Sequence, residues 1–298
     1  MLEKLAVVDE LPENERTGEG DGTFTSLGVF SVPQGSGNFL GFLGTLVIPG
    51  GSVAFTGVAP LQRGIYVGNG SSGSRVADLM TPIPGGSGNF TDFTASPSID
   101  GDSVGFIGIG SAGQKGLYFS HGGLTKIADT STPIPGGSGN FVDFLGLDVT
   151  GSSIAFRGAG NTAIGVYLSS SGKLSVIADS STAIPGGVGA FTGFGASVAA
   201  SDEAVTFTGS GASNQFGIYS TFGGQLGEVI DASGTLDGKA LDFLATGSDG
   251  FDDDQIAFLA GFADGSEAIY LATATPEPGA LVLLGAGLLG LAVRTRRS

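Results

Sequence analysis

The sequence predicts an all-β protein, a β-propeller of about five four-stranded blades followed by one C-terminal transmembrane helix. Three observations predict it: a repeat of about fifty residues, an alternation of large and small side chains within each repeat, and one long apolar run near the end of the chain. A β-solenoid or a sandwich of repeats is the alternative fold. A propeller of six blades is an alternative to one of five.

The repeat consists of three columns of similar residues. The first column is Val or Ile, a small residue, then Phe; the second ends in Tyr and the third in Asp. Its members are Val53–Phe55, Val104–Phe106, Ile154–Phe156, Val205–Phe207 and Ile256–Phe258, then Tyr66, Tyr118, Tyr167, Tyr219 and Tyr270, and then Asp78, Asp129, Asp179 and the degenerate Asp231. All five tyrosines of the chain fall in one column, which chance alone would hardly produce.

Each repeat has the pattern of four short strands separated by turns rich in Gly and Asp. In the second repeat we expect strands at Phe93–Ile99, Ser103–Ile109, Gly116–Ser120 and Leu124–Asp129. Large residues alternate with small ones in the central strand, so a period of two places them on opposite faces. The small face can receive the aromatic face of a neighbouring sheet, and we therefore expect the repeats to stack face to face.

The two ends of the repeat region complement each other. The fifth repeat stops near Ala272 without a fourth strand, while residues 2–9 resemble Leu124–Asp129. We therefore expect a strand from the start of the chain to complete the last blade and close the ring, which removes exposed strand edges. The repeat domain then spans residues 1–274, and residues 10–38 form an irregular insertion within it.

Composition restricts the class of protein. The chain has 298 residues, including 56 glycines and no cysteine, and its net charge is −16. Glycine without a three-residue period, together with 41% hydrophobic residues, favours a folded β protein with tight turns. The absence of cysteine excludes disulfides and thiolate metal sites. The acidic surface repels phosphate, so we expect no nucleic-acid partner.

Carboxylates provide the candidate metal ligands. The densest acidic cluster consists of Asp249, Asp252, Asp253 and Asp254. Hard cations favour such oxygen-rich loops, but the spacing matches no EF-hand or nonapeptide repeat. We expect a solvated turn there, with a calcium site as the alternative, and no other cofactor. For the Asp column we likewise expect acceptors of backbone N–H bonds in turns, with a shared cation at a channel mouth as the alternative.

The sequence offers little for catalysis. His121 is the one histidine, it lies in a Ser-His-Gly-Gly turn, and no Gly-x-Ser-x-Gly elbow exists. We therefore expect a non-enzymatic structural or interaction protein. The alternatives are an exported polysaccharide-acting enzyme and a calcium-dependent adhesin. An extracellular polysaccharide is a candidate partner, although the chain has no tryptophan and its tyrosines are expected in blade cores.

The last residues have three parts. Pro276, Glu277 and Pro278 precede an apolar run from Gly279, Ala280 and Leu281 to Leu291 and Val293, and Arg294, Arg296 and Arg297 follow it. As a helix, these roughly fifteen residues reach about 22 Å, less than the roughly 30 Å of a hydrocarbon core. We therefore expect a weak membrane anchor, with the arginines remaining on the cytoplasmic side as its basic stop.

This order of a Pro-Glu-Pro motif, an apolar segment and a basic cluster resembles the sorting tail of PEP-CTERM proteins, over residues 275–298. The resemblance implies export, recognition and cleavage by an exosortase near Pro276–Pro278, and delivery to the cell surface or extracellular matrix. Such proteins also need a signal peptide, and residues 1–4 open no apolar stretch. We therefore expect the true start to lie upstream of Met1.

Overall fold

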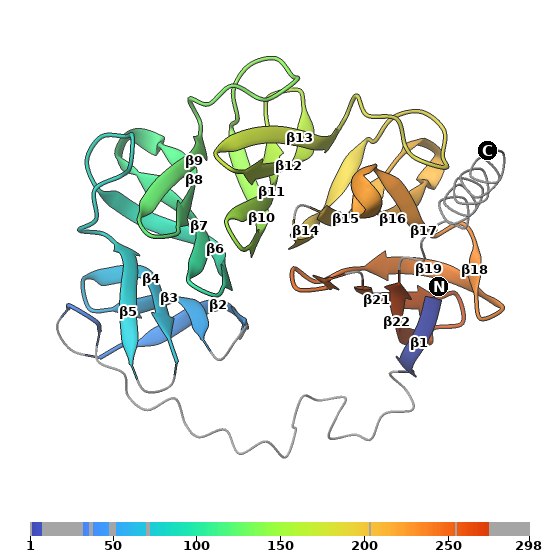
Figure 1. The fold of residues 1–298 in the computed structure, drawn as a ribbon, viewed down its shortest axis with the longest axis horizontal. Coiled ribbons are helices and arrows are strands. Elements are labelled where there is room, and N and C mark those ends of the chain that lie inside the picture. The colour runs from blue at the N-terminus through green and yellow to red at the C-terminus, as the bar shows by residue number, and fades with distance from the viewer. Residues whose placement is uncertain are drawn as a thin grey trace, which may run out of the picture.

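The computed structural model describes residues 2–7, 32–35, 38–47, 52–69, 72–202, 204–253 and 255–273. Apart from short 3-10 turns, the regular secondary structure in these ranges is β-strand, arranged as five antiparallel sheets around a common centre (Figure 1). The all-β prediction is confirmed. No helix within these ranges is long and apolar enough to cross a membrane, and the tail expected to do so lies outside them.

Sheets 1 to 4 each contain four strands, paired in chain order. Sheet 1 comprises β2 (Gly41–Val47), β3 (Val53–Ala59), β4 (Gln62–Gly68) and β5 (Gly73–Asp78), and sheet 2 comprises β6 (Phe90–Asp100), β7 (Ser103–Gly110), β8 (Lys115–Ser120) and β9 (Leu124–Asp129). Sheet 3 comprises β10 (Asp143–Thr150), β11 (Ser153–Ala159), β12 (Ile164–Ser170) and β13 (Lys173–Asp179), and sheet 4 comprises β14 (Gly193–Ser201), β15 (Ala204–Ser210), β16 (Phe216–Ser220) and β17 (Gly227–Asp231). The four strands expected in the second repeat are all present.

Sheet 5 is completed by the start of the chain. Its order is β1 (Leu2–Val7), β22 (Glu267–Thr273), β21 (Gln255–Phe262), β19 (Lys239–Ala245) and β18 (Thr235–Leu236), and β20 (Phe251–Asp252) also pairs with β21. β1 runs antiparallel to β22. An N-terminal strand in the last blade is therefore confirmed. Sheet 5 has more strands than the four expected, because a β18–β19 hairpin and the short β20 add to it.

Neighbouring sheets pack an aromatic face against a small face. Ala54, Ile65 and Ala77 of sheet 1 lie in one buried cluster with Phe93 and Phe106 of sheet 2. Equivalent clusters join sheets 2 and 3, sheets 3 and 4, and sheets 4 and 5. Burying one such aromatic side chain stabilises the fold by about 1.5–3 kcal/mol, so these junctions hold the scaffold together. The predicted face-to-face stacking is confirmed.

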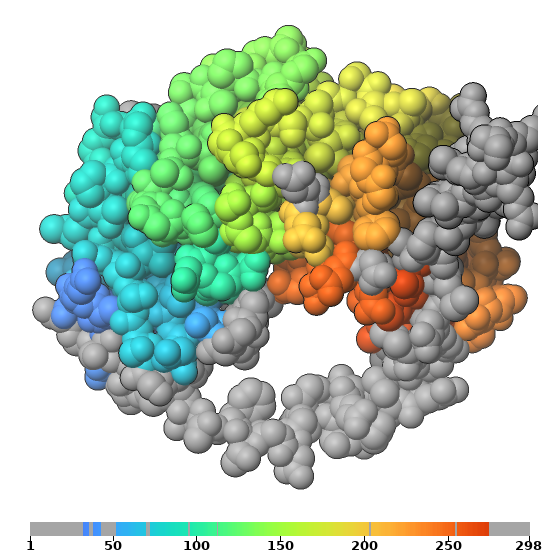
Figure 2. All heavy atoms as spheres, in the orientation of Figure 1, coloured from blue at the N-terminus to red at the C-terminus, as the bar shows by residue number. Residues whose placement is uncertain are grey.

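The ring is open in the described residues. No hydrophobic cluster among them joins sheet 5 to sheet 1, and the two sheets stand at opposite ends of an arc (Figure 2). Ring closure was expected to follow from the N-terminal strand, but completing a sheet and bringing the end sheets together are separate steps. The chain between β1 and Val32 lies outside the described residues.

The linkers between sheets repeat one turn. In the linker before sheet 2, Ile83 N donates to Gly88 O, Gly86 N donates to Ile83 O, and Pro82 pairs with Asn89. The same bonds recur in the linkers before sheets 3 and 4. Val32, which is buried, accepts a matching bond from Gly35 N. Residues 32–35, within the range expected to be an irregular insertion, therefore follow the linker pattern.

Candidate functional site

The recurring aspartates are acceptors in turns. Asp129 Oδ1 accepts hydrogen bonds from Ser131 N at 2.9 Å and Thr132 Oγ1 at 3.1 Å, and its other oxygen accepts from Lys126 Nζ at 2.8 Å. Burial opposes ionisation, but the bonds from Lys126 and Ser131 hold the pKa of Asp129 well below its ordinary value. Asp78 and Asp179 make the matching bonds. The turn interpretation of this column is confirmed.

The acidic loop of sheet 5, residues 249–254, holds aspartates in different surroundings. Burial raises the pKa of Asp249, whereas Asp252 and Asp253 are exposed. Asp254 lies outside the described residues. Within the described part of the chain, no three His, Cys, Asp or Glu side chains gather as a metal ion would require. Calcium binding by the four aspartates stays an untested alternative to the predicted solvated turn.

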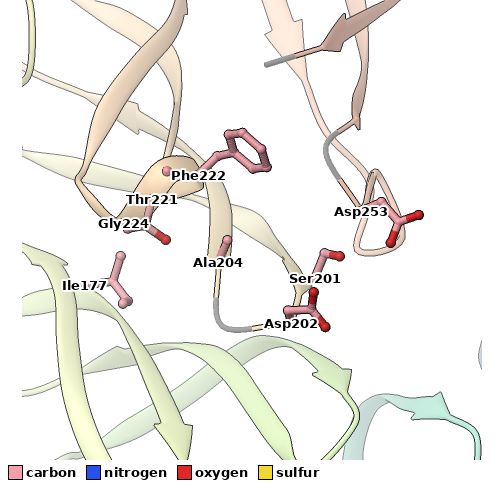
Figure 3. Close-up of a pocket in the computed structure, with 9 residues that line it drawn as sticks. Ile177, Ser201, Asp202, Ala204, Thr221, Phe222, Gly224 and Asp253 are labelled. Atoms are coloured by element: carbon pink, nitrogen blue, oxygen red, sulfur yellow. The ribbon is translucent and has the colours of Figure 1, made fainter. Parts of the chain in front are cut away.

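A pocket of about 460 Å³ opens where sheets 3, 4 and 5 meet (Figure 3). Its lining comes from β13, from the hairpin loops of sheet 4 and from the loop after β20. The residues are Ile177, Ser201, Asp202, Ala204, Thr221, Phe222, Gly223, Gly224 and Asp253. Two carboxylates, hydroxyl groups and one partly exposed aromatic ring suit hydroxyl-rich or cationic ligands and disfavour anions.

A short 3-10 turn, η5 (Phe222–Gly224), forms one wall of this pocket. Gly223 and Gly224 have φ values of 81° and 87°, in the left-handed region that favours glycine. The Phe222 ring lies 6.2 Å from the Phe251 ring of sheet 5, edge to face. Sequence patterns alone did not predict Phe222 or Asp202 as residues of a site. Phe222 stands beside a Gly-Gly turn, as His121 does in sheet 2, and that parallel was a usable signal.

Asp148 of β10 connects sheets 2, 3 and 4. Its Oδ1 accepts a hydrogen bond from Ser98 Oγ of sheet 2 at 2.9 Å, and its Oδ2 accepts one from Ala200 N of sheet 4 at 2.8 Å. The side chain is 4% exposed. Burial, aided by the nearby charge of Asp249, raises the pKa of Asp148 to about 7, although the hydrogen bonds oppose this. Sequence patterns alone did not predict a role for this residue.

His121 lies in the turn after β8, as expected. Its Nδ1 is 2.8 Å from Ser103 Oγ, and its ring stacks on Phe119. The Ser103 side chain is buried, and its hydroxyl also donates to the Gly151 carbonyl of sheet 3. These contacts link sheets 2 and 3 through the turn.

All the residues named for sorting and membrane anchoring lie outside the described residues. They are Pro276, Glu277, Pro278, the apolar run and the three arginines. Comparison of the sequence with known families supplies the information here. Residues 274–297 match the PEP-CTERM protein-sorting motif. No curated protein matches the sequence.

Several solved structures resemble the fold. The acylaminoacyl peptidase of Pyrococcus horikoshii is 12% identical, with a TM-score of 0.39, and the match covers 73% of this chain but 32% of that one. The Aleuria aurantia lectin is 15% identical with a TM-score of 0.36, covering 76% of this chain and 73% of that one. The β-propeller domain of the Trilobed protease of Pyrococcus furiosus is 11% identical with a TM-score of 0.38, and the match covers 78% of this chain and 83% of that one.

At these identities, nothing about ligand or activity passes from these proteins to this chain. The sorting motif is specific to a short segment and lies in the same place as the predicted tail. The chain thus carries a PEP-CTERM protein-sorting motif at residues 274–297, behind a series of propeller-like β-sheet repeats.

Proposed function

We propose that this chain is an exported protein delivered to the cell surface or extracellular matrix, where it has a structural or interaction role without catalysis. An exosortase-type protease recognises the tail and cleaves it near Pro276–Pro278. The sorting motif at residues 274–297 is the observation that carries this proposal. Before cleavage, the apolar run from Gly279 to Val293 anchors the chain in the membrane, with Arg294, Arg296 and Arg297 on the cytoplasmic side.

The repeat domain supports an interaction role. We interpret the arc of five sheets as an open β-propeller, a scaffold that presents many hairpin loops on its two rims. The net charge of the full chain, −16, keeps such a scaffold soluble outside the cell and disfavours binding to nucleic acid. The exposed carboxylates of Asp202 and Asp253 give one rim an acidic pocket.

The test is the mass of the mature protein in its host. We expect the product outside the cell to end near Pro276 and to lack the apolar run. Replacing Pro276, Glu277 and Pro278 with alanine should trap the intact chain in the membrane fraction. As a matched control, Pro82→Ala and Pro84→Ala change prolines in a linker and should leave processing unchanged. Normal release of the tail variant would contradict the proposal.

A further inference from the structure

The two ends of the arc carry faces that every internal junction buries. On sheet 1 we define the aromatic end face as Phe39, Phe42 and Phe55, which lie on the side away from sheet 2. Their rings contact one another at centroid distances of 5.1 to 5.6 Å. Phe42 is 41% exposed, whereas its equivalents Phe93, Phe144 and Phe194 are 1%, 1% and 7% exposed. Among the described residues, this face has the side chains of a junction but no sheet packed against them.

The opposite end of the arc has the matching surface. We define the aliphatic end face as Ala257, Leu259, Ile269 and Leu271, which alternate along β21 and β22 with residues buried against sheet 4. Ile269 is partly exposed, whereas its equivalents Ile65, Leu117, Val166 and Ile218 are at most 1% exposed. In each internal junction, such an aliphatic face packs against the aromatic face of the next sheet.

Within the residues that the structure describes, one chain therefore carries one unpaired copy of each half of an interface that it forms four times internally. We propose that the aliphatic end face of one copy docks on the aromatic end face of a second copy, so that the protein assembles end to end. The contact is heterologous, because the two copies use different surfaces, and such contacts generate rings or helical arrays. The internal junctions provide the template, since they show which chemistry covers each face.

The shape of the arc restricts the assembly. The five sheets turn through most of a circle (Figure 1), so a second copy that continues the same stacking must be displaced along the central axis. End-to-end docking then produces a helical array rather than a flat ring. For a protein delivered to a cell surface or matrix, such growth would form extended material from a single secreted chain.

Two single variants test the pairing, because each one removes one end face. Phe42→Asp places a charge on the aromatic end face, and Ile269→Asp places one on the aliphatic end face. Burying an unpaired carboxylate is strongly unfavourable, so we expect each to weaken association by more than about tenfold. The full chain, purified in detergent, should form oligomers whose mass grows with concentration, measured by light scattering corrected for bound detergent. Each variant alone should stay monomeric.

The mixture of the two variants is decisive. Each retains the face that the other has lost, so an equal mixture should form one-to-one dimers and nothing larger. Leu61→Asp, in a fully exposed turn of sheet 1, is the matched control and should assemble like the unaltered chain. Thermal melting checks that the variants fold, and Phe42→Ser replaces Phe42→Asp if the latter does not.

Three results would overturn the inference. The unaltered chain could remain monomeric at every concentration, which would mean that the end faces are covered within one chain, by residues 8–31 or by each other. Either variant alone could assemble as the unaltered chain does, which would place the contact elsewhere. The mixture could fail to dimerise although the unaltered chain assembles, which would mean that the contact is not heterologous.

Discussion

At the scale of the residue, we expect Asp148 to make the stability of the fold depend on pH. Its pKa is raised to about 7, so the folded protein holds this proton more tightly than the unfolded chain does. Its contribution is therefore greatest below about pH 4 and falls as pH rises to about 7, by at most about 1.4 kcal/mol per pH unit. Asp148→Asn should remove this slope. The melting temperature of the variant should therefore rise relative to that of the unaltered protein between pH 4 and pH 7.

Asp102→Asn, in the exposed turn after β6, is the matched control for the loss of one carboxylate. A constant difference between Asp148→Asn and the unaltered protein over this range would contradict the assignment. Asp129 acts in the opposite direction, because its lowered pKa contributes stability that is lost as pH falls. Comparing single variants separates the two effects.

The roles of individual residues could be predicted from the sequence where a residue recurs in every repeat, and not where its partners lie in other repeats. The tyrosine and aspartate columns recur, so their structural roles could be read from repetition alone. A close contact between a glycine and a phenylalanine ring also recurs, and the sequence pattern did not predict it. A Cβ added at Gly158 would lie 2.6 Å from the Phe141 ring, and Gly108 and Phe90 form the same contact. Asp148 could not be assigned a role in this way, because its bonding partners lie about fifty residues away on both sides.

At the scale of the element, β1 should be essential to sheet 5. It covers the edge of β22, whose backbone groups would otherwise be free to pair with other chains. Deleting residues 1–7 should lower the melting temperature and promote aggregation, which thioflavin fluorescence detects. A synthetic peptide of residues 1–9 added in trans should restore stability, and a scrambled peptide should not. An unchanged melting temperature would show that the β1–β22 pair contributes little.

Elements were predictable where the repeat holds and less so where it breaks. Strands β6 to β9 lie where alternation and Gly-Asp turns placed them, and the start of the chain was assigned to the last sheet by its likeness to β9. β18 and β20 were missed, because each is two residues long and has no counterpart in the other repeats. Such short strands depend on the neighbouring hairpin for their bonds.

At the scale of the whole molecule, repetition predicted the stacking of the sheets but not the open arc. Whether a ring closes depends on the curvature that four junctions accumulate, and no single repeat encodes that sum. The sorting tail, by contrast, was predictable from about twenty residues, because its three parts act through composition and order. The acidic pocket needed the structure, since its residues come from three different sheets.

Net charge at this scale should control the proposed assembly. Each copy carries a formal charge of −16, so copies repel one another, while the end faces named above are apolar. The Debye length falls from about 10 Å at 0.1 M salt to about 3 Å at 1 M, which screens the repulsion without weakening the apolar contact. We therefore expect association to strengthen as sodium chloride rises, measured by light scattering at fixed protein concentration. Phe42→Asp should stay monomeric throughout, which separates docking from general salting-out, whereas association that weakens with salt would indicate an interface built on ion pairs.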